Sequence, residues 1–337
     1  IQIGVNLFTI PLTHEEGHRS ILTTNNIGSV SNPFFNKNLA AYVKGVRDQT
    51  LIQLRNTNLP AYIRLHTAGL ESDYSLLLSE SSLLNWGKED FNILGMEFLM
   101  RKFNLIAYYF TVAINKDIKL KEEADELERD IAGHDVYGAI RHLHRPDMPF
   151  FRYTQSKDLT VEEQRFAKRV GWRSLLNLID PLILSKTGWE IKDGYKINGS
   201  IGYGMSPFGD YIDENIWLKA KRFNSHIYFR QHQNKTRWFP AIGVQMSDVY
   251  LTENIKSFFS LQSWMQPKEL DFNSSDSFFG GAVDCKLQYK FPLIDRSGLS
   301  ALSADVGVIA KTKGFMTGEA KLDSHVGLYV GLSVFME

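Results

Sequence analysis

The chain has 337 residues, of which 43% are hydrophobic, and its 38 basic residues balance its 38 acidic ones. This length favours two structural units, and the balanced charge argues against a protein whose whole surface binds nucleic acid, so we expect no nucleic-acid partner. The single cysteine, Cys285, excludes an intrachain disulfide. No secretory leader is visible, although Ile1 is not an initiator methionine.

Near the N-terminus, His14, Glu15 and His18 form an H-E-x-x-H pattern. On a helix, residues four apart lie on one face, so His14 and His18 can bind one tetrahedral Zn²⁺. Glu15 then lies beside the metal, where it can act as the base that removes a proton from the water that the metal activates. The alternative is a helix whose two histidines are solvated or hydrogen-bonded in a core.

The residues around this pattern favour the metal site. The apolar residues 5–12 lead directly into it, as a buried active-site helix requires. Gly17 allows another backbone or a substrate strand to approach closely. Pro11 predicts that the helix begins near it, because proline is favoured in the first turn.

Residues 39–84 show helical periodicity, with a break at residues 58–60. Within the second helical stretch, residues 69–74 resemble the helix that carries the third zinc ligand, a glutamate, in the gluzincin group of metallopeptidases. The resemblance implies that Glu71 is the third ligand. Some gluzincins have an acid four positions after this glutamate, where the present chain has Ser75. Alternative third ligands are Asp73, His134 and Asp180.

Residues 90–137 are also predicted to be helical. The most apolar part, residues 103–114, is about 12 residues long, shorter than the ~20 residues of a membrane-spanning helix, so we expect a buried core helix. The charged residues 119–130 are typical of a solvated helix face with i,i+4 ion pairs. A last helix is expected at residues 162–184.

A group of polar and aromatic side chains follows the charged run. It comprises His134, Asp135, Tyr137, Arg141, His142 and His144. Such groups orient metal ligands or stabilise an oxyanion, and we assign His134 and Tyr137 to the catalytic machinery, with Arg141 as a further candidate. His142 and His144 are two positions apart, on different helix faces, which favours a structural role.

From about residue 189 the periodicity changes from 3.6 to 2. Val283, Cys285 and Leu287 share one face of a predicted strand, and the charged or polar residues between them share the other. We predict strands at residues 195–205, 214–223, 225–233, 237–250, 256–266, 277–291, 299–312 and 325–336. The predicted fold class is α+β, with an N-terminal all-helical domain (1–188) followed by a C-terminal antiparallel β-barrel of about eight strands (189–337).

The final segment, residues 327–335, resembles the closing strand of bacterial outer-membrane β-barrels, which commonly ends in an aromatic residue, here Phe335. The resemblance implies that outer-membrane lipid is a partner. Long loops are expected at residues 206–213, 267–276 and 313–324, which places the helical domain on the periplasmic side. A soluble barrel or a sandwich is the alternative, because its strands alternate in the same way.

Together these patterns predict a membrane-tethered zinc metallohydrolase, most simply a peptidase acting on a peptide or protein substrate. In this hypothesis His14, His18 and Glu71 hold the zinc, and Glu15 is the base. A non-enzymatic barrel or scaffold subunit of a larger envelope complex, with an incidental or degenerate histidine pair, is the alternative. A weaker one is a lipid-modifying barrel enzyme, whose candidate histidines are His226, His232 and His325.

Overall fold

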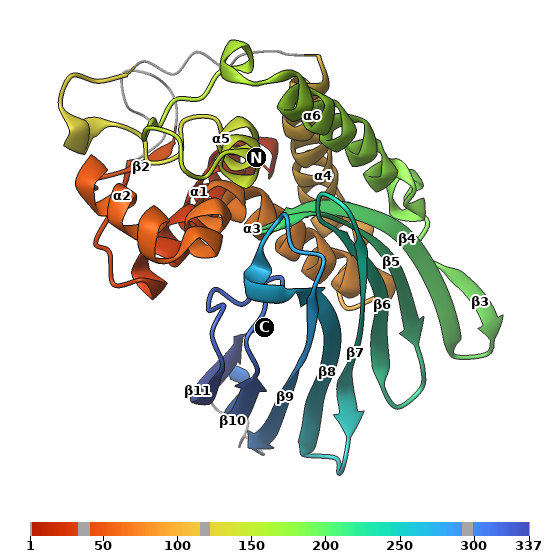
Figure 1. The fold of residues 1–337 in the computed structure, drawn as a ribbon. Helices are drawn as coiled ribbons and strands as arrows, with labels where there is room; N and C mark the ends of the chain where they lie inside the picture. Colours follow the sequence, from red (N-terminus) through yellow and green to blue (C-terminus); the bar gives the residue numbers. More distant parts are fainter. Residues whose placement is uncertain (1, 33–40, 115–121, 292–298, 337) are drawn as a thin grey trace.

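The computed structural model describes residues 2–32, 41–114, 122–291 and 299–336. It shows an N-terminal helical region followed by a large, curved antiparallel sheet, as the predicted α+β class requires (Figure 1). In the described ranges the α-helices are α1 (Gln2–Thr24), α2 (Asp48–Thr57), α3 (Leu59–Asn85), α4 (Phe91–Ala113), α5 (Asp135–His144) and α6 (Val161–Arg173). Short 3-10 helices are η1 (Glu126–Glu128), η2 (Ser156–Asp158), η3 (Ser174–Leu178), η4 (Pro181–Leu184) and η5 (Lys268–Leu270). The strands are β1 (Val30–Asn32), β2 (Tyr42–Lys44), β3 (Trp189–Lys192), β4 (Tyr195–Ser206), β5 (Gly209–Lys219), β6 (Asn224–Gln233), β7 (Trp238–Tyr250), β8 (Ile255–Pro267), β9 (Ser277–Phe291), β10 (Leu299–Lys311) and β11 (His325–Met336).

Helix α1 carries the H-E-x-x-H pattern, but it begins at Gln2 and not near Pro11. Pro11 therefore lies inside the helix, where it cannot donate a backbone hydrogen bond. The helix continues because tertiary contacts hold the turns before the proline: Ile10 is buried, and Asn6 contacts Met100 of α4. The predicted start was wrong because the first-turn preference of proline is only a local tendency.

The predicted break at residues 58–60 is confirmed by the start of α3. The Asn58 side chain accepts a hydrogen bond from the backbone of Ala61, which caps the helix, and Pro60 lies in the first turn. Asparagine at the cap and proline in the first turn are both favoured at helix starts, so the local sequence determines this boundary.

The segment before α2 differs from the prediction, since residues 42–44 form strand β2 and pair with β1. Val43 is fully buried there, and Gly45 has a φ of +86°, which interrupts a right-handed helix. The N-terminal part is therefore not all-helical. Residues 39 and 40 of the predicted helix lie outside the described residues.

The charged run is not a helix either. Its described part, residues 122–130, contains one 3-10 turn, and residues 119–121 lie outside the described ranges. Glu128 pairs with Lys44 of β2 instead of with a neighbour along a helix. The charges are thus satisfied between segments, which the i,i+4 pattern did not reveal.

Helix α4 confirms the helix predicted from residue 90 to 114, but the expected buried core helix is only partly buried, since Leu105 and Tyr109 are buried and Phe103 is exposed. Within the described part of the chain, none of the helices combines the length and the apolar composition needed to cross a bilayer. The helix predicted at residues 162–184 ends at Arg173 and is followed by η3 and η4. Asp180 begins η4, where its side chain accepts a hydrogen bond from the Leu182 backbone.

Strands β3 to β11 form one nine-stranded antiparallel sheet in which each strand pairs with its neighbours in the chain. Eight of these strands were predicted, and β9 and β11 have the predicted bounds. The prediction missed β3, whose four residues are too few to show alternation. It also placed a long loop at residues 206–213, whereas Ser206 pairs with Gly209 across a tight turn. Gly209 has a φ of +147°, which suits that turn.

The sheet is not closed into a barrel, so the prediction of a closed barrel of about eight strands was wrong. Its edge strands are β3 and β11. Beyond β3, the edge of β4 is occupied by the segment after α6: the Ile201 N–H donates to the Ile179 carbonyl, and the Tyr203 N–H donates to the Asn177 side chain. Closure would need these same main-chain groups. Alternation of faces is identical in open and closed sheets, so it could not decide closure.

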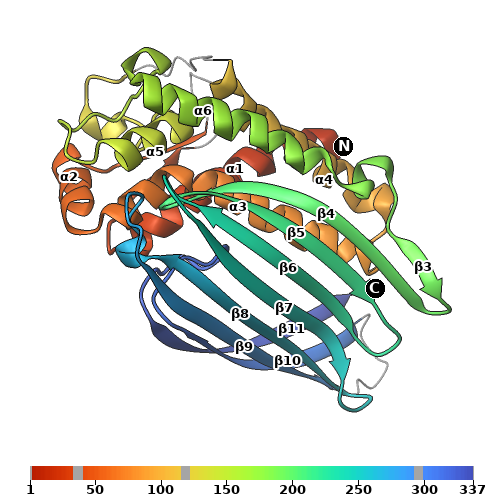
Figure 2. The same cartoon turned by 45° about the vertical axis from the view of Figure 1, so that its right-hand side comes forward.

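Helix α3 lies against one face of the sheet, which we call the inner face (Figure 2). Tyr74 donates a hydrogen bond to Asp213 of β5 over 2.8 Å, and Trp217 donates to Ser82 over 3.0 Å. Buried apolar side chains from the helices and from the sheet form one continuous core. The opposite face of the sheet is called the outer face below.

Candidate metal centre

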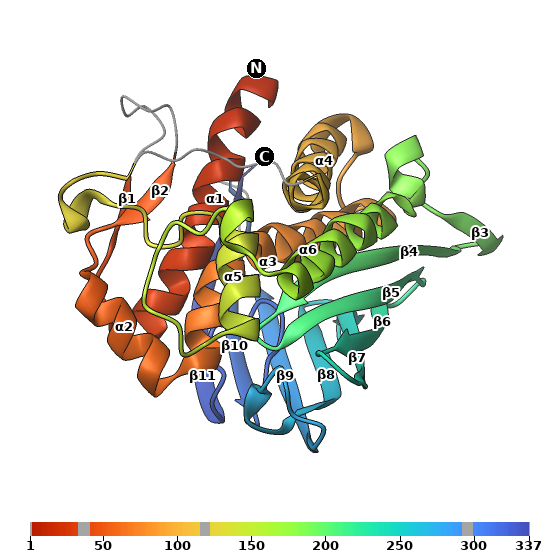
Figure 3. The ribbon, with the colours of Figure 1, turned by 45° about the horizontal axis from the view of Figure 1, so that its top comes forward.

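Helix α1, which carries the H-E-x-x-H pattern, packs against α3 within the helical region (Figure 3). A Cβ on Gly17 would lie 2.4 Å from the carbonyl oxygen of Ala68, so the close approach of the two helices requires glycine there. Another backbone does pack on Gly17, as predicted, and it belongs to α3. The crossing buries His14 and His18 against that helix.

One ring nitrogen of each histidine is held by the protein. His14 Nδ1 lies 2.8 Å from Asp73 Oδ2, and His18 Nδ1 lies 2.6 Å from the Leu65 carbonyl oxygen. A carboxylate or a backbone carbonyl on the second nitrogen is the usual support of a metal-binding histidine, because it orients the ring and fixes the tautomer. These contacts leave the two Nε2 atoms as the candidate metal ligands.

Both Nε2 atoms point at the same carboxylate oxygen. Asp135 Oδ2 lies 3.0 Å from His14 Nε2 and 3.4 Å from His18 Nε2. Ligands about 2.0–2.1 Å from a tetrahedral zinc ion are about 3.3 Å apart from one another. Asp135 therefore stands where a third ligand of such an ion would stand, at the first residue of α5.

Gly69 of α3 faces this convergence point. A Cβ at Gly69 would lie 2.3 Å from His14 Nε2 and 2.5 Å from His18 Nε2. Any side chain at this position would fill the space that the two nitrogen atoms share. The absence of a side chain therefore keeps open the place that a metal ion would need.

Glu15 belongs to the same cluster. Ligand atoms of His14, Glu15 and His18 lie within 4.8 Å of one another, and Glu15 is only partly buried. Burial raises the pKa of Glu15 to about 8, and the positive charge on His18 and His14 opposes this rise. The carboxyl group is thus close to a potential metal ligand set and is sensitive to positive charge there.

The carboxylates of the cluster stabilise positive charge between the two histidine rings. Burial by itself lowers the pKa of His18, but the Asp135 carboxylate outweighs it and raises that pKa to about 9. The His14 pKa is likewise raised well above its usual range by Asp73 and Asp135 in spite of burial. Burial works against ionised Asp135, yet the two histidines hold its pKa far below the ordinary value. Protons on the rings thus supply a positive charge between the nitrogens and the carboxylate, where a metal ion could replace them.

Glu71, the predicted third ligand, lies in a different contact. Arg64 donates to both of its carboxylate oxygens, over 2.9 Å and 2.5 Å, and the Gly318 N–H donates to one of them over 3.1 Å. The structure does not bring Glu71 together with the histidine cluster. Asp73, two residues later on α3, instead reaches His14 as a hydrogen-bond partner on the side away from the metal position.

The other candidate ligands of the prediction are also placed. The Asp180 carboxylate forms a buried ion pair with Lys102 of α4, and the lysine neutralises the carboxylate charge. His134 is the residue that precedes α5, and its ring centre lies 4.1 Å from that of Tyr137. The structure brings His134 and Tyr137 together, next to the Asp135 ligand position.

The side chain that links this pair to the cluster is Tyr108 of α4, which was not singled out in the sequence. Its ring centre lies 5.6 Å from His134 and 5.7 Å from His14. Burial raises the pKa of Tyr108 well above its usual range, so the phenol keeps its proton and can donate a hydrogen bond. Tyr108 was hidden because it lies in the apolar run that reads as a core helix.

The remaining candidates lie elsewhere. Arg141 donates to the Pro149 carbonyl, while His142 and His144 bond to carbonyls of their own helix, in agreement with a structural role for both histidines. The three sheet histidines do not form a cluster with one another: His226 contacts Asn215 and stacks on Trp217, His232 packs near Phe208 and Tyr211, and His325 lies 3.7 Å from Glu319.

Comparisons with family models, curated proteins and solved structures found no match to this chain. The geometry of the His14, His18 and Asp135 side chains is therefore the basis for any functional argument.

Proposed function

We propose that this protein is a zinc-dependent hydrolase that acts on peptide bonds. The observation that carries the proposal is the convergence of His14 Nε2 and His18 Nε2 on one oxygen of Asp135, with the opposite nitrogen of each ring held by the protein. Two imidazoles and one carboxylate are a common set of three protein ligands in catalytic zinc sites, which keep a further position open.

In this proposal His14, His18 and Asp135 hold the metal, and Asp135 takes the place that the resemblance to gluzincins assigned to Glu71. The residues fit a small cation because Gly69 leaves the shared space open and because the cluster attracts positive charge. Zn²⁺ bound there would act as a Lewis acid that lowers the pKa of a water molecule, polarises a carbonyl group and favours ionised Glu15.

Glu15 is the proposed general base. It follows His14 directly, is partly exposed, and has no hydrogen-bond partner among the described residues that would compete for its carboxylate. It can take a proton from water and pass it to the leaving amine. Tyr108, beside His14 and with a phenol that stays protonated, is the proposed hydrogen-bond donor to the developing oxyanion. His134 packs against Tyr108 and Tyr137 packs against His134, so the proposed role of both is to position Tyr108 and not to contact substrate.

Peptide bonds are the proposed substrate because H-E-x-x-H, with its carboxylate next to the first ligand, is the pattern of zinc metallopeptidases. A mixed peptide library is therefore the suitable first substrate. Cleavage products identified by mass spectrometry would also give the preferred residues around the cut bond.

The experiment compares the wild-type protein with Glu15→Gln and with Glu16→Gln. The wild type should contain about one zinc per chain by elemental analysis. Glu15→Gln should keep the zinc and lose about 10²–10⁴-fold in hydrolysis. Glu16→Gln is the matched control, because Glu16 is exposed and paired with Arg19, and it should keep full activity.

Two results would contradict the proposal. A protein that binds no divalent metal after loading would remove the metal centre itself. A protein that holds zinc but cleaves none of the peptides, with Glu15→Gln indistinguishable from wild type, would point to a structural metal site in a non-enzymatic scaffold.

A further inference from the structure

The outer face of strands β6 to β11 is apolar and is not covered by any described residue. Leu328 and Val330 of β11 expose 82% and 83% of their surface. The register pairs them with Val308 and Val306 of β10, which are exposed on the same face. Exposed apolar patches that extend over several strands mark contact with something other than water.

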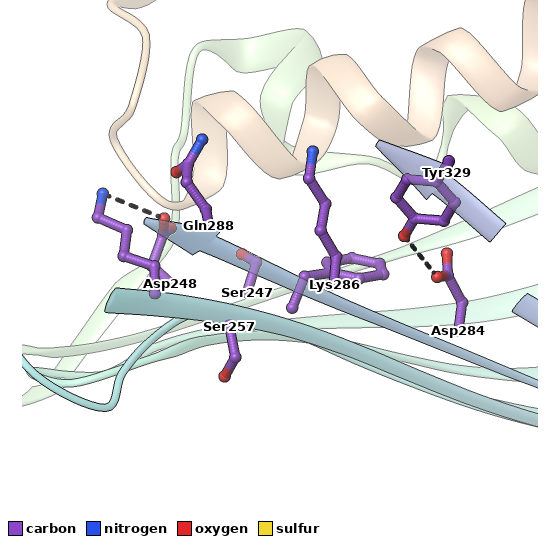
Figure 4. A pocket seen from close by; sticks show the side chains of 9 residues that line it. Ser247, Asp248, Ser257, Asp284, Lys286, Gln288 and Tyr329 are labelled. Carbon is purple, nitrogen blue, oxygen red and sulfur yellow. Dashed lines mark hydrogen bonds and ion pairs between the residues drawn. The ribbon is translucent and has the colours of Figure 1, made fainter. Parts of the chain in front are cut away.

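Charged side chains are missing from this face. Through the described residues from Ile227 of β6 to Leu332 of β11, the outward positions carry apolar, aromatic or uncharged polar side chains. The charges of the same strands point inward. Figure 4 shows Lys286 and Gln288 on the inner side of β9, with Ser257 of β8 on the opposite side.

The inner face contributes apolar side chains to the core on β4 and β5, whereas on strands β8 to β11 it is mostly polar and partly hollow. A cavity of about 380 Å³ lies there, lined mainly by polar and charged side chains that include Asp248, Lys286 and Tyr329 (Figure 4). Tyr329 donates a hydrogen bond to Asp284 over 2.8 Å, across from β11 to β9. A sheet with one face in water normally has the covered face apolar and the free face polar, and on β8 to β11 the order is reversed.

The dimensions of the apolar face match the hydrocarbon layer of a bilayer. Aromatic side chains stand near both ends of β9, with Phe279 at one end and Tyr289 and Phe291 at the other, and aliphatic Val283 and Leu287 lie between them. The ten residue-to-residue steps from Phe279 to Tyr289 cover about 34 Å along the strand. At a tilt of about 40° this is about 26 Å, close to the ~25 Å apolar band of membrane sheets.

We propose that the outer face of β6 to β11 contacts the hydrocarbon of a lipid bilayer. Lipid fits better than a second protein, since a typical protein–protein interface has a polar rim and about one hydrogen bond per 100–200 Å². This face offers few donors or acceptors for such contacts. The free main-chain edge of β11 would not be satisfied by hydrocarbon, so the assignment concerns the outer face and not the edge.

The native cysteine provides the test. Cys285 lies on the outer face, because its register partners are Val308 of β10 and Phe259 of β8. An environment-sensitive fluorophore on Cys285 should shift to the blue with phosphatidylcholine vesicles. It should be quenched by nitroxide-bearing lipid and protected from aqueous iodide. The control is Cys285→Ser combined with Glu162→Cys on α6, where iodide should quench and the lipid should not.

A substitution pair gives an independent measurement. Leu328→Lys with Val330→Lys should lower partitioning into the same neutral vesicles by at least about 30-fold, because lysine on a lipid-facing strand is strongly unfavourable. Val161→Lys, at an exposed apolar position of α6, should leave partitioning unchanged. Circular dichroism would show that the variants keep their fold.

The inference is overturned if the Cys285 label stays accessible to iodide when vesicles are present. It is also overturned if the label is protected without lipid and sedimentation shows a dimer, because a second copy of the chain would then cover the face. Neither result depends on zinc binding or hydrolysis, so failure here is distinguishable from failure of the proposed function.

Discussion

A buried acid lies on each side of helix α3, Glu71 on α3 itself and Asp135 on the neighbouring α5, and the two negative charges are neutralised in different ways. On the side that faces the β10–β11 loop, Glu71 receives two hydrogen bonds from Arg64 and one from Gly318. On the side that faces α1 and α5, the ion pairs of Asp135 among the described residues are with His14 and His18. We call these the loop side and the metal side.

The difference between the loop side and the metal side lies in where the positive charge comes from. The Arg64 guanidinium is always charged, so the loop side is neutralised by the chain itself. On the metal side the positive charge comes from histidine, which is charged only when protonated. The Asp135 carboxylate favours the protonated ring and raises the pKa of His18 to about 9 against the effect of burial. A buried acid is therefore a better metal candidate when no arginine or lysine already satisfies it.

The largest expected effect comes from filling the metal side. Gly69→Ala places a Cβ within 2.5 Å of both Nε2 atoms, and the rings cannot simply turn away because Asp73 and Leu65 hold them. Zinc affinity should fall by more than the ~100-fold that loss of a supporting hydrogen bond costs. Isothermal titration with zinc would measure it.

Gly4→Ala is the matched control for this prediction. Gly4 is likewise a glycine within a helix, here α1, and a Cβ there would meet nothing within 4 Å. Equal zinc affinities of the two glycine variants would show that the space at Gly69 is not the metal position.

The second-largest effect is expected on the loop side, where a substitution should lower stability without changing zinc affinity. Glu71→Ala removes one partner of a buried ion pair and leaves Arg64 uncompensated, so the free energy of unfolding should fall by about 3–5 kcal/mol. Urea unfolding of the metal-free protein would measure it. Zinc affinity should stay as in the wild type, and a large loss of zinc would return Glu71 to the ligand set.

Asp73→Asn tests the hydrogen bond that supports His14 at the ring nitrogen opposite the candidate metal-binding Nε2. The amide keeps the shape of the side chain but not its charge, so His14 loses the carboxylate that orients its ring. Zinc affinity should fall about 10–100-fold. Asp193→Asn is the matched control, since that side chain is almost fully exposed in the β3–β4 turn, and it should leave zinc affinity unchanged.

The smallest expected effect is at the contact between α1 and α3. Ser72 donates a hydrogen bond to the Thr13 carbonyl over 2.9 Å. Ser72→Ala should lower the free energy of unfolding by about 1 kcal/mol, with no change in zinc affinity. A loss of zinc as large as that of Asp73→Asn would mean that the helix crossing itself, and not the ligand contacts, controls the site.

The sequence predicted much of this molecule because several signals are local. The spacing of His14 and His18 places them on one helix face whatever the rest of the chain does. The period-2 alternation located eight of the nine strands of the sheet, with β9 and β11 at their predicted bounds. Asn58 and Pro60 marked the start of α3 because capping preferences act within one turn.

The errors arose where tertiary contacts override local preference. Residues 42–44 became a strand because pairing with β1 satisfies their backbone and buries Val43. The barrel was predicted because alternation does not report on sheet edges. Only the fold shows that the segment after α6 occupies the edge of β4.

The third candidate ligand was also mispredicted because tertiary contacts decide it. Glu71 and Asp73 are two residues apart on α3, and the sequence offers no reason to send one to Arg64 and the other to His14. Asp135 lies 117 positions beyond His18, and it meets the two histidines only through the packing of α5 on α3.

The sequence by itself therefore determined the histidine pair, the adjacent carboxylate of Glu15 and the two kinds of periodicity, because each follows from the geometry of one helix turn or one strand. The tertiary structure decided which acid meets the histidines, that Gly69 leaves the space between them open, and that the sheet stays open. These depend on contacts between distant segments, whose energies are set by burial and charge compensation, and no short stretch of sequence contains them.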